Sequence, residues 1–162
     1  MRKLALVSGF PCLVDAVDYF NSQGYEAIIG LGDVECPQYL ENFYGILGEM
    51  ESVFVMKYLK STGRLIDSST FERLFNLGLK VFMTHFPPKG YGTGTIGGFT
   101  VGKDTPIPKG EKVLILHGHS DYPSVVKKDE TTVISVGSVL KGFYVELLPD
   151  TLEFSFKRVA MR

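Results

Sequence analysis

The chain has little of what marks several common protein classes. It has 162 residues, and 17 Lys and Arg nearly balance 18 Asp and Glu, so the net charge is -1. Basic residues gather in nothing longer than pairs such as Lys127-Lys128. Nucleic-acid binding depends on a concentrated positive charge. We therefore expect no nucleic-acid partner.

Cysteine is equally scarce. Cys12 and Cys36 lie far apart and form no C-x-x-C pair, so the sequence indicates neither a disulfide framework nor a zinc knuckle. A reducing compartment is the simplest interpretation, and we expect a cytoplasmic protein. The apolar start, Leu4–Val7, resembles a signal peptide, but Ser8 and Gly9 interrupt it. No run approaches the roughly 18 apolar residues of a membrane span, so no membrane association is expected.

What the chain does contain is enough apolar material for a core. Hydrophobic residues make up 44% of it and aromatic residues 12%. A chain of this length and composition fits one compact unit. We expect residues 1–162 to form a single domain.

Alternating apolar patterns predict an α/β order in the first half. Short apolar runs at Leu4–Val7 and Ala27–Leu31 are typical of buried strands, and residues 13–24 between them have helical spacing. Tyr39–Leu47 is predicted as a second amphipathic helix and Val53–Met56 as a third strand. This order favours parallel strands with helices on their faces.

The second half is predicted to be rich in strands. A short helix is expected over Phe71–Leu77 and a fourth strand over Lys80–Thr84. Residues 86–111 are rich in Gly, Pro, Thr and Lys, which predicts a long loop. Four further strands follow, forming a mixed or antiparallel sheet packed on the first: Val113–Leu116, Thr132–Val136, Phe143–Leu148 and Leu152–Phe156.

Chemistry-bearing residues follow several of these strands. Leu31-Gly32-Asp33-Val34 ends the second strand, and His85 ends the fourth, followed by Pro87-Pro88. His117-Gly118-His119-Ser120-Asp121 and Val136-Gly137-Ser138-Val139 come later. In this order the motifs resemble the calcineurin-like metallophosphoesterase family, of the small single-domain phosphodiesterase type, over residues 3–156. The family pattern is D-x-H, G-D, G-N-H/C-D, a strand-end His, G-H-x-H and a late G-S.

The resemblance implies an α/β (α+β) fold, a four-layer α-β-β-α sandwich of two mixed sheets. It also implies two metals at the carboxyl ends of the strands. Two cations close together clamp a phosphoryl group and lower the pKa of a bridging water. Carboxylates and imidazoles are the usual ligands of such metals.

The chain departs from the family pattern at three places. Gly9-Phe10-Pro11 stands in the place of D-x-H, and neither Gly nor Pro provides a ligand. Met56–Ser61 is predicted to stand in the place of G-N-H/C-D, without an Asn. Asp121 replaces the second His of G-H-x-H.

The remaining motif residues are expected to surround one metal position. The resemblance assigns Asp33, His85 and His119 to it, with Asp121 as a further candidate ligand. Two imidazoles and a carboxylate suit one divalent metal such as Mn, Zn, Fe or Ni.

A second expectation concerns the space that the missing Asn would leave. Lys57, Tyr58 or Lys60 is expected to project into it, where a lysine charge would bind phosphate or repel the metal.

Structural alternatives exist for each of these side chains. Asp33 is also suited to capping a following helix, or to a buried ion pair with His85 and His119. Asp121 is equally suited to a turn, and His117 is expected to be a surface or packing residue rather than a ligand.

One further motif does not carry the chemistry it suggests. Gly97–Lys103 fits G-x-x-x-x-G-K, but Asp104 follows it and Pro106 prevents the required helix. We expect this loop at the rim of the site, with Tyr91 and Phe99 as part of a mobile cover.

Two functions remain open from the sequence. In the first, the chain is a degenerate metallophosphoesterase with a remnant single-metal or phosphate-binding site, and it binds a small phosphate ester or phosphate with weak or no hydrolysis. In the second, it is a noncatalytic scaffold that binds a protein partner and no metal. Loss of acid-base catalysis alone removes about 10²–10⁴-fold in rate, which favours weak or absent hydrolysis.

Overall fold

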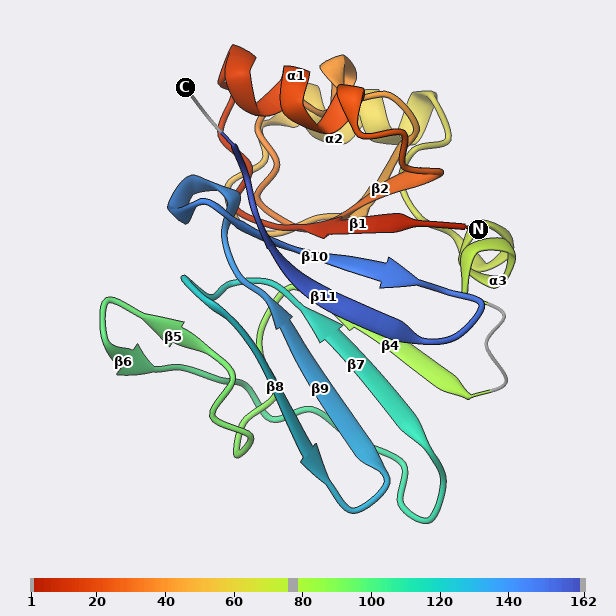
Figure 1. Cartoon of the computed structure of the whole chain (residues 1–162), viewed down its shortest axis with the longest axis vertical. Helices are drawn as coiled ribbons and strands as arrows, with labels where there is room; N and C mark the ends of the chain where they lie inside the picture. Colours follow the sequence, from red (N-terminus) through yellow and green to blue (C-terminus); the bar gives the residue numbers. More distant parts are fainter. Residues whose placement is uncertain (1, 76–78, 161–162) are drawn as a thin grey trace.

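Two mixed β-sheets packed face to face form the centre of the structure (Figure 1). The computed structural model describes residues 2–75 and 79–160. The first sheet has the order β11-β10-β1-β2-β3, in which β1, β2 and β3 are parallel. Its strands are β1 (Leu4–Val7), β2 (Ala27–Leu31), β3 (Phe43–Ile46), β10 (Phe143–Leu148) and β11 (Glu153–Arg158).

The second sheet has the order β4-β7-β9-β8, with β8 antiparallel to the other three. A short hairpin of β5 (Thr95–Ile96) and β6 (Phe99–Thr100) forms a separate ribbon (Figure 1). The strands of the second sheet are β4 (Lys80–Thr84), β7 (Val113–His117), β8 (Pro123–Lys128) and β9 (Thr131–Val136).

The core lies between the two sheets and follows from the alternation of side chains along each strand. Leu4 and Leu6 of β1 point into it, and Leu114 and Leu116 of β7 belong to the same cluster from the opposite sheet. All of them are buried. Inward apolar faces on both sheets therefore hold the sandwich together.

Two helices cover the outer face of the first sheet, α1 (Val14–Ser22) and α2 (Val53–Ser61) (Figure 1). The Ser52 hydroxyl caps α2 by accepting a hydrogen bond from the Val55 amide at 3.2 Å. Val55 and Leu59, one turn apart, are the buried residues of α2. No helix in the described part of the chain is long and apolar enough to cross a membrane.

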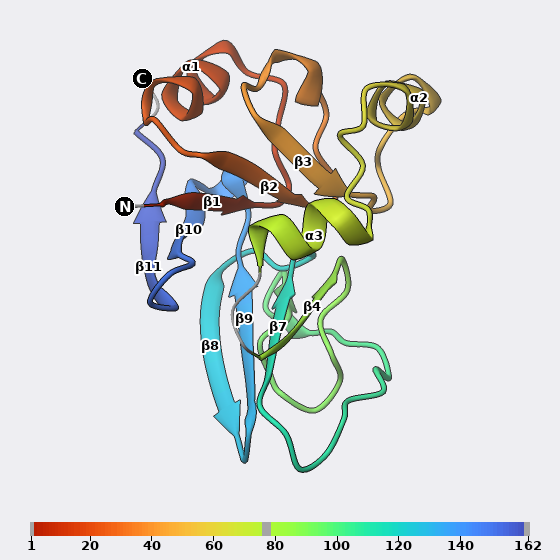
Figure 2. The same cartoon turned by 90° about the vertical axis from the view of Figure 1, so that its right-hand side faces the viewer.

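Helix α3 (Ser68–Leu74) lies at the edge between the two sheets (Figure 2). Its Leu74, together with Phe75, packs into the core between the sheets. The sequence predicted a helix over Phe71–Leu77, and Leu77 lies outside the described residues.

The predicted sandwich of two mixed sheets is confirmed, with one difference in its outermost layer. Between β4 and β7 the described chain contains no helix, and Tyr91 and Ile107 of this segment pack on the outer face of the second sheet. The glycines and prolines of residues 86–111 explain this, because both residue types destabilise helices.

Two predicted elements are wrong. Tyr39–Leu47 is not a helix, because Phe43–Ile46 pairs with β2 as strand β3. The Phe43 ring lies against Gly30 and Gly45, where a Cβ would come within 2.5 Å and 2.7 Å of it. Val53–Met56 is not a strand but the start of α2, because the apolar spacing continues beyond Met56 to Leu59.

Strand β8 was not predicted from the sequence. It runs along the edge of the second sheet, begins with Pro123 and ends in Lys127 and Lys128. Proline and lysine are typical of edge strands, where one side faces solvent. Residues 123–128 therefore contain too few apolar side chains to indicate a strand from the sequence.

Candidate metal centre

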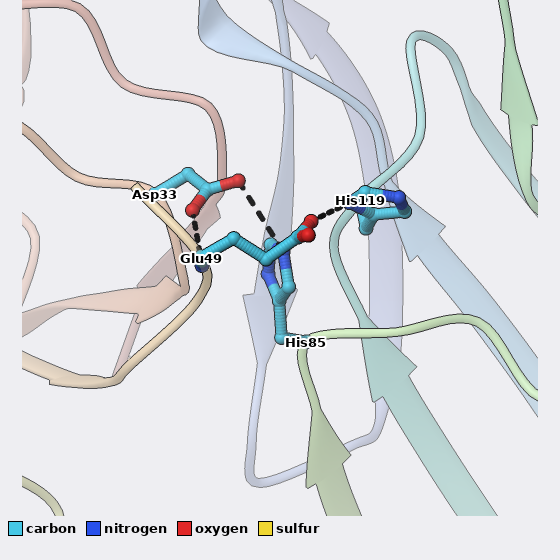
Figure 3. A group of neighbouring side chains, drawn as sticks. All are labelled: Asp33, Glu49, His85 and His119. Carbon is cyan, nitrogen blue, oxygen red and sulfur yellow. Dashed lines mark hydrogen bonds and ion pairs between the residues drawn. The ribbon is translucent and has the colours of Figure 1, made fainter. Parts of the chain in front are cut away.

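Four side chains from four strand ends meet at one edge of the sandwich (Figure 3). Asp33 follows β2, Glu49 follows β3, His85 follows β4 and His119 follows β7. One ligand atom from each lies within 4.8 Å of all the others. The carboxyl ends of parallel strands point to the same edge of a sheet, which explains why distant residues converge here.

Sharp turns hold these strand ends close together. Gly32 has φ +101°, Asp33 φ 60° and His119 φ 49°, a left-handed backbone region that favours glycine. A Cβ on Gly32 would collide with Nδ1 of His85. The glycine therefore allows the imidazole to lie directly against the main chain.

Two carboxylates lock the loop after β2 to the loop after β3. Oδ1 of Asp33 accepts hydrogen bonds from the amides of Glu49 (2.7 Å) and Met50 (2.8 Å). In return, Glu51 accepts from the amide of Asp33 through Oε2 (2.7 Å) and from the amide of Gly48 through Oε1 (2.9 Å). Charge-assisted bonds of this kind are the stronger ones in proteins. Asp33 is therefore fixed with its other oxygen, Oδ2, turned towards the imidazoles.

His85 provides the most informative atom of the cluster. Its side chain is only 4% exposed, and Nδ1 donates to the Leu31 carbonyl oxygen at 2.8 Å. A neutral imidazole then carries a lone pair on Nε2. That atom is buried and has no hydrogen-bond partner among the described residues. It faces Oδ2 of Asp33 at 3.3 Å and Oε1 of Glu49 at 3.6 Å.

His119 completes the group. Its Nδ1 lies 2.9 Å from Oε1 of Glu49. The Phe86 ring packs against both imidazoles, with centroids 4.9 Å from His85 and 4.9 Å from His119. The Phe86 ring on one side and the main chain at Leu31 and Gly32 on the other leave His85 little freedom to turn.

The arrangement fits a divalent cation. A lone pair on Nε2 aimed at carboxylate oxygens is repulsive unless a proton or a metal lies between them. Histidines that bind metals almost always donate their other ring N–H to a carbonyl or carboxylate, as His85 does to Leu31. Two imidazoles and two carboxylates suit Zn, Mn or Fe.

Glu49 was missed from the sequence, and the cause was an error of register. Met56–Ser61 lies in α2, so the loop that follows the third strand is the one containing Gly48-Glu49-Met50-Glu51. In the pattern that the sequence resembles, this register would put Glu49 in the place of the Asn and Met50 in the place of the His. A glycine followed by acidic residues, between the apolar run at residues 43–47 and the capping Ser52, was the available signal.

The expectation for Lys57, Tyr58 and Lys60 is also wrong. All three lie on α2, which covers the outer face of the first sheet. Lys57 and Lys60 are exposed there, and Tyr58 packs against the core beneath the helix.

The other candidate residues lie close to the cluster but outside it. Oδ2 of Asp121 accepts from the Gly97 amide at 2.9 Å, which links it to the β5–β6 hairpin. His117 is a packing residue, hydrogen-bonded through Nε2 to the Thr93 hydroxyl at 2.8 Å. Its burial lowers its pKa to about 4, so it is neutral at neutral pH. Asp33 does not cap a helix; it receives the amides described above.

The rim differs from the expectation for both aromatic residues. Tyr91 packs on the second sheet, and Phe99 is exposed at the hairpin. Ile96 of β5, rather than either aromatic ring, lines the cavity beside the cluster.

The two cysteines correct a further expectation. Cys12, in the loop after β1, and Cys36, in the loop after β2, form a disulfide with their Cα atoms 5.4 Å apart. Sequence distance hid the pairing, because parallel neighbours β1 and β2 bring the two loops together. The disulfide fixes the loop that carries Asp33 to the loop that contains Gly9 and Pro11.

Comparisons with known proteins support the fold. No family model matches the chain, and no curated protein matches its sequence. Among solved structures, protein TM1076 of Thermotoga maritima superposes with a TM-score of 0.56 at 20% identity and covers 100% of both chains. YfcE, a phosphoesterase from E. coli, superposes with a TM-score of 0.41 at 15% identity, over 98% of this chain and 100% of its own. The chain therefore shares its fold with TM1076 across its whole length.

Proposed function

We propose that the chain is a degenerate member of the calcineurin-like metallophosphoesterase family that binds one divalent metal. Asp33, Glu49, His85 and His119 hold the metal, and hydrolysis of phosphate esters is weak or absent. The observation that carries the proposal is Nε2 of His85, a buried ring nitrogen that faces two carboxylates and has no hydrogen-bond partner among the described residues.

The residues around the cluster support the loss of the second metal. Gly9 and Pro11 stand where the family has its D-x-H ligands, and neither side chain can bind a cation. Met50 stands where the family has the histidine that acts on the leaving group. Two-metal catalysis and acid-base catalysis are thus both missing. Acid-base catalysis alone contributes about 10²–10⁴-fold to the reaction rate.

Metal addition tests the proposal through stability. A ligand that binds only the folded state at 100 times its Kd stabilises by about 2.7 kcal/mol. For a chain of this size, that raises Tm by roughly 5–10 °C. We expect this rise with Mn²⁺ or Zn²⁺ in the natural chain and in Asp121→Asn, and its loss in Glu49→Ala. Glu49 suits this test because its side chain is half exposed and its ion pairs within the described part of the chain are with the two histidines.

Assays of phosphate monoesters and diesters with added metal test the catalytic part. Turnover near background is expected, and turnover typical of phosphoesterases would refute the degeneracy. If no divalent metal raises Tm, the noncatalytic scaffold with a protein partner becomes the better account, and the cluster is a buried ion pair. The cytoplasmic location stays a prediction. Unpaired cysteines no longer support it, because Cys12 and Cys36 form a disulfide.

A further inference from the structure

A cavity of about 250 Å³ opens beside the proposed metal position. Asp33, Glu49 and His119 form one side of it, and Met50 and Ile96 form apolar walls. Asp121 adds a third carboxylate. None of the described residues that line the cavity is a lysine or an arginine. Lys103 lies close by, but its ammonium group sits over the Phe86 ring, 3.6 Å from the centroid.

The charges of this site do not favour an anion. The ligand carboxylates Asp33 and Glu49 cancel the two charges of one divalent cation, and Asp121 makes the cavity negative. In the family pattern, an amide stands in the place of Glu49 and a second cation is present, so the site is positive. Coulomb attraction for a phosphate dianion is therefore lost here.

Two of the three serine hydroxyls that line the cavity, those of Ser8 and Ser120, give the same indication. The Ser8 hydroxyl donates to the Gly32 carbonyl oxygen at 3.0 Å. The Ser120 hydroxyl has main-chain carbonyl acceptors, the nearest being those of Thr93 and Tyr122 at 3.2 Å. A hydroxyl has one proton, and these carbonyl oxygens accept it, so neither hydroxyl donates to phosphate oxygens. Both keep some capacity to accept from a ligand, although the Ser120 oxygen already accepts from the Thr95 amide at 3.1 Å.

We infer that the site takes an uncharged ligand that carries both a nitrogen or oxygen donor for the metal and an N–H or O–H group. Azoles and amides are molecules of this class. Glu49 is the residue that sets this preference, because it contributes its charge at the metal itself. The inference rests on the metal-binding part of the proposed function and replaces the phosphate ester as the ligand.

Cobalt substitution tests this inference in the natural chain. Uptake of Co²⁺ is measured first by its visible absorption, and imidazole and inorganic phosphate are then titrated separately. We expect imidazole to change the spectrum at a concentration at least about tenfold lower than phosphate does. Removing one charge within a few ångströms changes affinity by roughly 10- to 100-fold, so Glu49→Gln should tighten phosphate binding by that factor.

Two control variants separate the position of the charge from its mere presence. Asp121→Asn removes a carboxylate from the cavity but not from the metal ligands, so a smaller gain in phosphate affinity is expected. Glu41→Gln removes an exposed carboxylate elsewhere and should leave both titrations unchanged.

Several results would overturn the inference. Tighter binding of phosphate than of imidazole by the natural chain contradicts it, as does unchanged phosphate affinity in Glu49→Gln. If Glu49→Gln takes up no Co²⁺, an unchanged phosphate affinity in Asp121→Asn contradicts it instead. Absence of Co²⁺ uptake by the natural chain refutes the proposed metal site, and with it this inference, before any ligand is added.

Discussion

Replacing Glu51 by glutamine should unlock the two loops that carry the cluster. The Glu51 carboxylate is partly buried and accepts from the amides of Asp33 at 2.7 Å, Gly48 at 2.9 Å and Val34 at 3.4 Å. Glutamine keeps one acceptor oxygen but turns an NH₂ group towards at least one of these donors. We call the hydrogen bonds between the Glu51 carboxylate and these amides the carboxylate clamp. In Glu51→Gln one side of this clamp is lost, and a main-chain N–H on that side faces the NH₂ group of glutamine.

The expected cost follows from the strength of these bonds. A hydrogen bond to a charged group contributes about 1.5–3 kcal/mol, and an unsatisfied donor adds a desolvation penalty. Because the site is only partly buried, we expect Glu51→Gln to lower the free energy of unfolding by about 2–4 kcal/mol. That change lowers Tm by roughly 5–15 °C in a chain of this length.

Urea unfolding of the natural chain and of Glu51→Gln measures this loss directly. Glu41→Gln is the matched control, because it makes the same chemical change at an exposed position and should stay within about 0.5 kcal/mol. Metal affinity should fall together with stability, since the clamp positions two ligands. If Glu51→Gln were as stable as the control, the carboxylate clamp would not hold these loops.

Three further predictions concern other parts of the structure. Gly48→Ala should cost more than about 2 kcal/mol and weaken metal binding, because its Cβ would lie 2.5 Å from a ligand carboxylate oxygen; Gly24→Ala, in open space with φ +73°, should cost only about 1 kcal/mol in the same urea titration. The double variant Cys12→Ser and Cys36→Ser should have a free energy of unfolding about 3 kcal/mol lower, since the disulfide closes a loop with a sequence separation of 24. A reductant should lower the stability of the natural chain but leave that of the double variant unchanged. Burial raises the pKa of Tyr25 to about 12, so the folded state holds this proton more tightly than the unfolded chain. The free energy of unfolding should therefore fall between pH 10 and 12. Ultraviolet absorbance of the folded protein should show a tyrosine that ionises near pH 12.

The fold was largely predictable because its strongest signal is local. Continuous apolar runs such as Leu4–Val7 and Ala27–Leu31 indicate buried parallel strands with little ambiguity. The third strand was not predictable in this way. Its residues alternate between buried and half-buried positions, and Gly45 interrupts the apolar run where the Phe43 ring occupies the space of a Cβ.

The candidate site was predictable where a motif sits directly at the end of a clear strand. Asp33, His85 and His119 meet this condition, and the structure brings all three together. Glu49 does not meet this condition, because it follows β3, which the sequence did not indicate as a strand. The Cys12–Cys36 pairing was hidden for a related reason, because it depends on which strands are neighbours rather than on spacing along the chain.

Metal stoichiometry tests the proposed metal site most directly. The natural chain is saturated with Zn²⁺ or Mn²⁺, dialysed and analysed for metal and protein content, beside His85→Ala and Asp121→Asn. The account predicts one metal ion per chain in the natural protein and in Asp121→Asn, and none in His85→Ala. A natural chain without metal, or metal retained in full by His85→Ala, would contradict it.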